Sequence, residues 1–192
     1  KQPGSIWSVR APAFNLGSLS TTGIDYTLRY RIPHFDLGSL DPGDFRAGLN
    51  TTYTSTYKNS ATPGQPGAES VNYAGTFSSQ FGNISRWRGT FTLNWTKGNW
   101  SAQWQARYIN RLTVLKADAV TGANSPMASV IYHALQLGYE VPKWHTRFDI
   151  GVDNVSDKAP PLVYQNSGNY NVDTSTYDPI GRYYWARATL KF

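Results

Sequence analysis

Regularly spaced carboxylates are the first residues of this sequence that could do chemistry. Asp149 and Asp153 are four residues apart on one face of an alternating segment, and Asp157 follows. Carboxylate oxygens are the ligands that Ca²⁺ prefers, so a calcium site is one interpretation. The neighbouring Arg147 and Arg187 favour another, in which cations offset the carboxylates along a wet surface. We therefore predict no metal site here.

Residues suited to catalysis are few. His34, His133 and His145 lack the spacing of metal ligands, and Glu69 and Glu140 are the only glutamates. The absence of cysteine removes thiol chemistry and disulfides. The sequence contains no nucleophile-elbow, phosphate-loop or dinucleotide motif. We expect a protein that is not an enzyme and that needs no cofactor.

Aromatic residues in segments rich in Gly, Ser and Asn are the remaining candidates for recognition. Aromatic planes beside amide and hydroxyl groups suit sugars or catecholate-like ligands. The candidate ligand-binding residues are Tyr73, Phe77, Tyr164, Tyr170 and Tyr177. The same rings could equally pack the loops onto one another, so both roles stay open.

The composition narrows the class of protein. Only 16% of the 192 residues are charged, below the roughly 25% of ordinary soluble domains. Aromatic residues reach 15%, and the net charge is +6. The basic residues are scattered singly along the sequence, which argues against a nucleic-acid partner. No apolar run approaches the ~18 residues of a membrane helix.

A period of two residues recurs along the chain and predicts β-strands, with no convincing helical period. The expected strands are 23–32, 45–53, 87–95, 100–108, 131–141, 146–154 and 184–192. Each carries apolar residues on one face and polar residues on the other. Their lengths fit the ~9–11 residues of a tilted transmembrane strand.

Short and long connections alternate between these strands. The short turns are at 97–99 and 142–143, and 33–44 is longer but compact. The long loops are at 58–85, 110–129 and 155–182. Transmembrane barrels have this asymmetry, and aromatic residues gather at the strand ends here, as they do at membrane interfaces. The pattern predicts an all-β, antiparallel transmembrane β-barrel segment of about seven strands.

The polar face of these strands would line a wet lumen, where charged side chains are inexpensive. The expected lumen-lining residues are Arg29, Arg88, Arg107, Arg147, Asp149 and Arg187. The apolar face would then contact lipid. A soluble β-sandwich also alternates in this way, so alternation alone does not decide between the two.

The end of the chain resembles known outer-membrane sequences. The last strand, with Tyr184, Leu190 and a terminal Phe192, is similar to the signal that the barrel assembly machinery reads. The preceding segment resembles the C-terminal part of TonB-dependent outer-membrane receptors. The matching positions are Gly151, Asn154, Asp157, Lys158, Pro160, Pro161, Tyr177, Asp178, Gly181, Arg182 and Phe192. Ser156 departs from the family, which usually has a bulky apolar residue there.

The resemblance implies a 22-stranded barrel with a plug in its lumen. Residues 1–192 would be the C-terminal portion, without the plug and the N-terminal barrel strands. The receptor would sit in the bacterial outer membrane and import a scarce nutrient, such as a siderophore or carbohydrate, with energy from TonB. The implied partners are outer-membrane lipid, the remaining receptor segments, the TonB complex, the assembly machinery and the nutrient.

Two other functions remain open at this point: a passive porin-type barrel, and a soluble β-sandwich that binds carbohydrate. In the receptor, the chain supplies barrel wall, lumen lining and extracellular loops. An odd number of strands would not close into a bacterial single-chain barrel. We therefore expect 184–192 to pair with 146–154 and not with 23–32.

Overall fold

The computed structural model describes residues 17–33, 35, 38, 40–60, 70–78, 80–114, 126–163 and 171–191. Of the residues singled out above, Tyr164, Tyr170, His34, Glu69 and Phe192 lie outside the described part of the chain.

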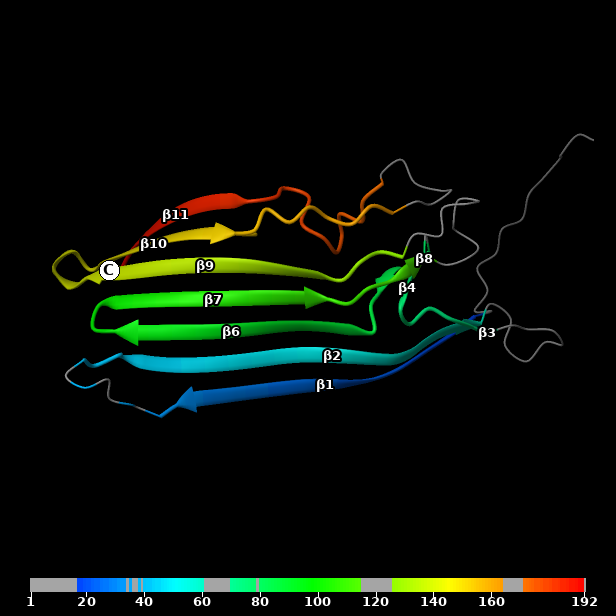
Figure 1. Cartoon of the computed structure of the whole chain (residues 1–192), viewed down its shortest axis with the longest axis horizontal. Helices are drawn as coiled ribbons and strands as arrows, with labels where there is room; N and C mark the ends of the chain where they lie inside the picture. The colour runs from blue at the N-terminus through cyan, green and yellow to red at the C-terminus, as the bar shows by residue number, and fades with distance from the viewer. Residues whose placement is uncertain are drawn as a thin grey trace, which may run out of the picture.

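One antiparallel sheet dominates the structure (Figure 1). Its main strands follow the order β1-β2-β6-β7-β9-β10-β11, and β3 pairs with the end of β2. The main strands are β1 (Ser18–Ile32), β2 (Asp44–Ser60), β6 (Trp87–Lys97), β7 (Trp100–Ile109), β9 (Val130–Val141), β10 (Thr146–Asp153) and β11 (Tyr183–Leu190). All seven expected strands are therefore confirmed.

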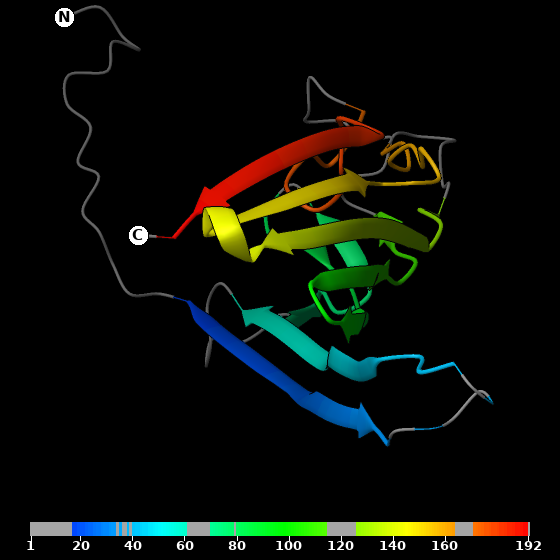
Figure 2. The same cartoon turned by 90° about the vertical axis from the view of Figure 1, so that its left-hand side faces the viewer.

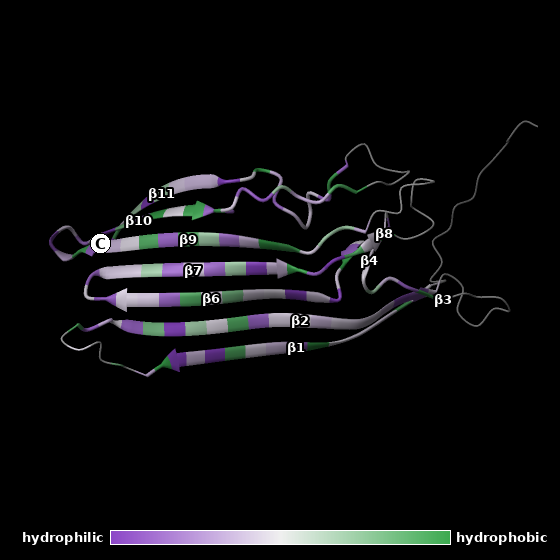
Figure 3. Cartoon of the chain, viewed as in Figure 1, coloured by the Kyte–Doolittle hydropathy of each residue, from purple (hydrophilic) through white to green (hydrophobic). Residues whose placement is uncertain are grey.

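The register aligns the apolar positions of all seven main strands on one face. One row across the sheet contains Ile32, Phe45, Trp95, Ala102, Leu137, Ile150 and Ala186. The next row of the other face contains Arg31, Arg46, Asn94, Gln103, Gln136, Gly151 and Trp185. Figure 3 shows the resulting alternation of hydrophobic and hydrophilic residues along each strand. We call these surfaces the apolar face and the polar face.

The sheet has a turn end and a loop end (Figure 1). At the turn end, Gly98 lies in the β6–β7 turn with a φ of 55°, a conformation that glycine adopts at little cost. The 3₁₀ helix η1 (Pro142–Trp144) joins β9 to β10 at the same end. The described parts of the long connections lie at the loop end, which confirms the predicted asymmetry.

Two features of the loop end differ from the sequence-based expectation. β1 and β2 continue to Ser18 and Ser60 and so extend beyond the predicted strands. These extensions are rich in Ser and Thr, so they lack the apolar period that a prediction needs. Four short strands also form in the long loops: β3 (Ser70–Asn72), β4 (Thr76–Ser78), β5 (Gly82–Ile84) and β8 (Thr113–Val114). Strands this short show no period.

The hydrophobic core lies at the loop end rather than in the middle of the sheet. We call this core the loop cluster. It consists of Phe77, Ile109, Leu112, Val114, Met127, Val130, Tyr132, Val163 and Tyr177. Ile109 and Val130 belong to the polar-face register of β7 and β9. The loop segments therefore pack against the polar face at this end.

Seen from the turn end, the main sheet is an open arc with β1 and β11 at its two edges (Figure 2). β11 pairs antiparallel with β10, and within the described residues no pairing joins β11 to β1. The expected pairing of the last strand is confirmed. Over the same described residues, no helix is both long and apolar enough to cross a membrane.

Candidate functional site: the polar face and its loop cluster

The polar face carries all six side chains that the sequence assigns to a lumen. Arg88, Arg107, Arg147, Asp149 and Arg187 alternate with apolar-face residues along β6, β7, β10 and β11, and Arg29 does so along β1. The cross-strand register keeps them on one surface. Arg147 and Asp149 are two residues apart in the sequence, whereas the structure brings the other four residues to the same face from separate strands.

Arg147 and Asp149 form the centre of a hydrogen-bond network on this face. The Arg147 Nη2 atom lies 2.7 Å from Asp149 Oδ1, and the same guanidinium donates to Ser101 Oγ at 2.7 Å. Gln136 donates to Asp149 Oδ1 at 3.0 Å. Gly138 leaves the space for this network, because a Cβ there would lie 2.5 Å from Asp149 Oδ1. Asp149 thus accepts hydrogen bonds from Arg147 and Gln136 within the sheet. This agrees with the interpretation in which neighbouring cations, rather than a metal ion, offset its charge.

Asn83 and Tyr177 join the loop cluster to β6. The Asn83 side chain donates to Tyr177 Oη at 3.2 Å, and its Oδ1 accepts from Arg88 Nη2 at 2.7 Å. Arg88 also donates to the Asn83 carbonyl. Because Asn83 is buried and both ends of its amide are used, it fixes the loop segment against the polar face.

Tyr177 is only 2% exposed, and its burial changes its acidity. Removal from water disfavours the phenolate and raises the pKa of Tyr177 to about 12, partly opposed by the hydrogen bond from Asn83. The ring therefore stays neutral at every physiological pH. A neutral phenol is suited to structural hydrogen bonding rather than to proton transfer.

Arg107 holds a second loop segment. Its Nη1 donates to the Thr176 carbonyl at 3.0 Å, and its guanidinium lies 4.8 Å from the ring centroid of Tyr132. Beside it is a polar hollow of about 470 Å³. Its lining combines polar-face residues with two loop residues and includes Asp25, Thr52, Arg88, Arg107, Ser175 and Thr176. This arrangement offers cationic, acidic and hydroxyl groups to a polar ligand.

The three aromatic candidates in the described part of the chain do not line this hollow. Tyr73, Phe77 and Tyr177 are buried, and Phe77 and Tyr177 belong to the loop cluster. Tyr73 packs edge-on against Phe81 with ring centroids 4.7 Å apart. Their burial favours the packing role over direct ligand contact, and contact with a ligand stays a prediction. Of the polar groups at this end, Arg88 and Arg107 were predicted from the sequence, whereas Asn83, Ser175 and Thr176 were missed because Gly- and Ser-rich loops give no pattern in sequence.

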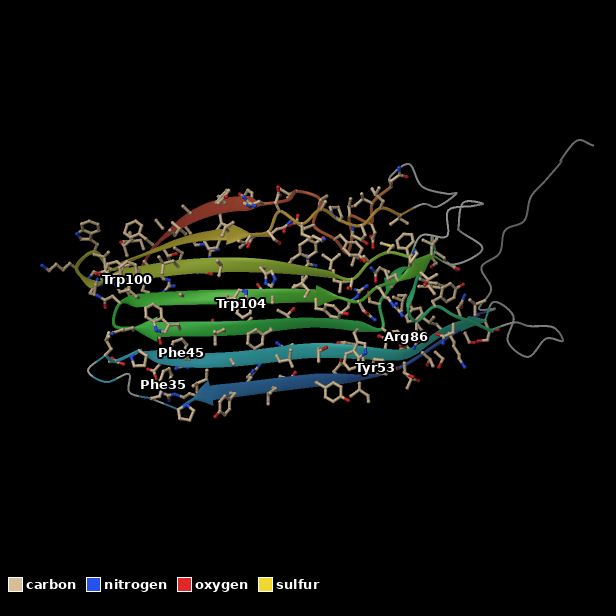
Figure 4. All side chains as sticks on the ribbon, viewed as in Figure 1. Phe35, Phe45, Tyr53, Arg86, Trp100 and Trp104 are labelled. Atoms are coloured by element: carbon tan, nitrogen blue, oxygen red, sulfur yellow. The ribbon has the colours of Figure 1, made fainter. Side chains whose placement is uncertain are left out.

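Aromatic pairs mark both ends of the apolar face. Tyr53 and Trp87 have ring centroids 4.7 Å apart near the loop end, and Trp100 and Tyr139 have centroids 4.5 Å apart at the turn end. Figure 4 shows Tyr53 and Trp100 towards opposite ends of the sheet. The expected concentration of aromatic residues at the strand ends is confirmed.

The chain matches the family described as TonB dependent receptor-like, beta-barrel, over residues 3–155. The chain belongs to this family. No curated protein and no solved structure gives a significant match. As a TonB-dependent receptor barrel, the chain belongs to an outer-membrane protein of Gram-negative bacteria and serves transport across that membrane. Members of the family are transporters rather than enzymes.

Most of the C-terminal motif named above lies beyond the matched residues, which end at 155, but the structure gives it a physical basis. Asn154, buried at the end of β10, accepts from Lys158 N at 2.8 Å and donates to the Lys158 carbonyl. Asp157 Oδ1 accepts from Arg182 N at 2.8 Å. Gly181 has a φ of 82°, and a Cβ there would lie 2.8 Å from Asp157 Oδ1. The motif therefore fastens the last long loop to the start of β11.

Proposed function

We propose that this chain supplies barrel wall, lumen lining and extracellular loops to a receptor that imports a scarce nutrient with energy delivered by TonB. Family membership supports a transport role in the outer membrane. A siderophore, a carbohydrate or a similar polar compound fits the polar groups of the loop end. The following observations support the assignment of each surface.

The apolar face is the observation that best supports the proposal, because large apolar side chains are exposed across the whole sheet. Leu28 on β1 is 62% exposed and Ile150 on β10 is 57% exposed. Within the described residues no second sheet covers this face. An apolar surface of this extent is stable against lipid and unfavourable in water. The apolar face therefore contacts outer-membrane lipid, and the polar face lines the lumen.

The loop end faces the outside of the cell. Long loops of outer-membrane barrels are extracellular and short turns are periplasmic. The polar hollow beside Arg88 and Arg107 then lies at the outer mouth of the lumen. A nutrient arriving from outside would meet these groups first.

Residues 1–192 are the C-terminal portion of the larger barrel in this proposal. The edges of β1 and β11 pair with strands of the remaining receptor, which also provides the plug and the segment that binds TonB. Exposed strand edges invite association, so pairing removes a hazard. Tyr184, Leu190 and Phe192 form the signal for the barrel assembly machinery. Tyr184 and Leu190 are exposed on the apolar face, where an assembly factor could contact them.

The two alternative functions are less well supported. A soluble β-sandwich would bury the apolar face between two sheets, whereas this face is exposed. A passive porin shares the two-faced wall, but the family match is to receptors of the TonB-dependent type.

Uptake measurements test the proposal. The receptor is expressed in a bacterium that lacks related receptors, and radiolabelled ferric siderophores and maltodextrins are offered to cells with and without TonB. We expect one of these compounds to accumulate only in cells that contain TonB. Equal accumulation without TonB would refute energy coupling.

Conductance separates the receptor from a porin. The purified receptor is incorporated into a planar lipid bilayer under an applied voltage. A lumen occupied by a plug should pass little current. Stable, permanently open channels would favour the porin.

A further inference from the structure

Three arginines meet on the polar face near the turn end, although they are spread over two strands. Arg31 on β1 lies directly opposite Arg46 on β2, and Arg29 lies two residues before Arg31 on the same face. The sequence shows no cluster of basic residues here. The antiparallel register of β1 and β2 creates one.

The charges of this arginine cluster are incompletely balanced. Arg31 lies 3.1 Å from Asp44, and both side chains are exposed. Within the described residues, Arg29 and Arg46 donate no side-chain hydrogen bond that could neutralise them. Like charges that face each other across two strands destabilise a sheet. An anion between or above Arg31 and Arg46 would therefore relieve the repulsion that Asp44 leaves uncompensated.

A hollow of about 460 Å³ lies beside the cluster, and all three arginines contribute to its lining. The described residues that line it include Arg29, Arg31, Arg46, Asn50, Thr92 and Asn94, and none of its described lining residues is acidic. Asn94 Oδ1 accepts from Gln103 at 2.9 Å, which leaves the Asn94 amide group free to donate. Gly48 keeps the floor open, since a Cβ there would lie 2.8 Å from Thr92 Oγ1.

We infer that this hollow binds a free oxyanion, the phosphate or carboxylate group of a small solute in the lumen. Guanidinium groups bind both kinds of oxyanion through paired hydrogen bonds, and the amide and hydroxyl groups satisfy the remaining oxygen lone pairs. The inference rests on the proposed function, because it requires the polar face to line the lumen. It adds a substrate class: the imported compound carries an anionic group.

Phosphate binding to the intact receptor tests the inference. The receptor is purified in detergent, and inorganic phosphate replaces chloride at constant ionic strength while calorimetry records binding. Arg46→Gln and Arg29→Gln should each weaken phosphate binding about tenfold, since each removes a charge-assisted hydrogen bond. Lys58→Gln is the matched control, because Lys58 is an exposed cation of β2 outside the hollow. It should bind phosphate as the parent receptor does.

Thermal unfolding is the second measurement. The change in melting temperature caused by Arg46→Gln should have opposite signs for an anion from solution and for a carboxylate of the receptor itself. Without phosphate, Arg46→Gln should raise the melting temperature, because it removes the repulsion with Arg31. Phosphate should cancel that advantage. If Arg46→Gln instead lowers the melting temperature and phosphate does not bind, a carboxylate of the receptor itself occupies the cluster and the inference is wrong.

Equal phosphate binding by the parent receptor, both arginine variants and the control would show an adventitious ion only, which also overturns the inference. These measurements do not depend on transport. TonB-dependent uptake could therefore be confirmed while the oxyanion site fails. A loss of TonB dependence with intact phosphate binding would instead count against the proposed function.

Discussion

Asp149 is 4% exposed on the polar face, and its charge is tolerated because Arg147 binds it. A buried carboxylate without a partner is costly, whereas an apolar replacement of both members of a pair often costs little. The network therefore holds β7, β9 and β10 together, but an apolar pair in its place should also allow the chain to fold.

This account predicts the effect of removing one partner. Arg147→Leu should lower the free energy of unfolding of the receptor by about 1–3 kcal/mol, since it leaves the Asp149 carboxylate with Gln136 as its remaining side-chain donor. The double variant Arg147→Leu/Asp149→Leu should recover most of this loss. Urea unfolding in detergent measures both values. If the double variant were as unstable as the single one, packing rather than charge would explain the network.

The raised pKa of Tyr177 predicts that the folded state loses stability at alkaline pH. Its pKa is raised to about 12 by burial, while an exposed tyrosine in the unfolded chain has a pKa near 10. The folded state therefore keeps a proton that the unfolded state releases. The resulting stability is complete below pH ~10 and is lost as the pH rises from about 10 towards 12.

The measurement compares urea midpoints near pH 9 and near pH 11 for the parent receptor and Tyr177→Phe. The parent should lose roughly 1–2 kcal/mol more than the variant over this interval. The variant is the control, because phenylalanine does not titrate at this position. Equal losses in both proteins would show that Tyr177 ionises as freely as an exposed tyrosine.

At the scale of single strands, β9 and β7 illustrate how one alternating pattern serves two environments. Leu137 points to the apolar face, and Gln105 of β7 belongs to the polar face opposite Thr92 and Ala134. The alternation of β-strand side chains makes this separation automatic once the register is set.

Arginine substitutions on the two faces should therefore have unequal effects. Leu137→Arg should cost about 2–4 kcal/mol if the side chain lies near the bilayer midplane, because a cation is then placed against lipid. Gln105→Arg, the matched control, should cost little in a wet lumen. Refolding into lipid vesicles measures both. A negligible effect of Leu137→Arg would show that the apolar face is in water.

For the whole molecule, the separation of short turns from long loops predicts which parts are reached from outside the cell. Trypsin added to intact cells should cut within 58–85, 110–129 or 155–182, because the proposed orientation places these segments outside the cell. Lys97 and Lys143 at the turn end should be spared. Permeabilised cells are the control, in which the turn end becomes accessible. Cleavage after Lys97 in intact cells would reverse the proposed orientation.

The sequence by itself determined the seven main strands, their two faces and the positions of the short turns. These properties are local, since a residue's neighbours two positions away decide which face it joins. Arg147 and Ile150 could thus be assigned to opposite faces before their strand partners were known. The family resemblance at the C-terminus rested on residues close together in the chain, such as Asn154, Asp157 and Lys158.

Only the tertiary structure decided which residues of different strands meet. The register placed Arg31 opposite Arg46, and the folding of the loops joined Asn83 to Tyr177 across 94 positions of the chain. Segments rich in Gly and Ser have no period, so neither their short strands nor their buried contacts can be inferred from residue order. Burial also favours the packing role for Tyr73 and Phe77, which the sequence left open, because exposure depends on what packs over a ring and not on the residues beside it in sequence.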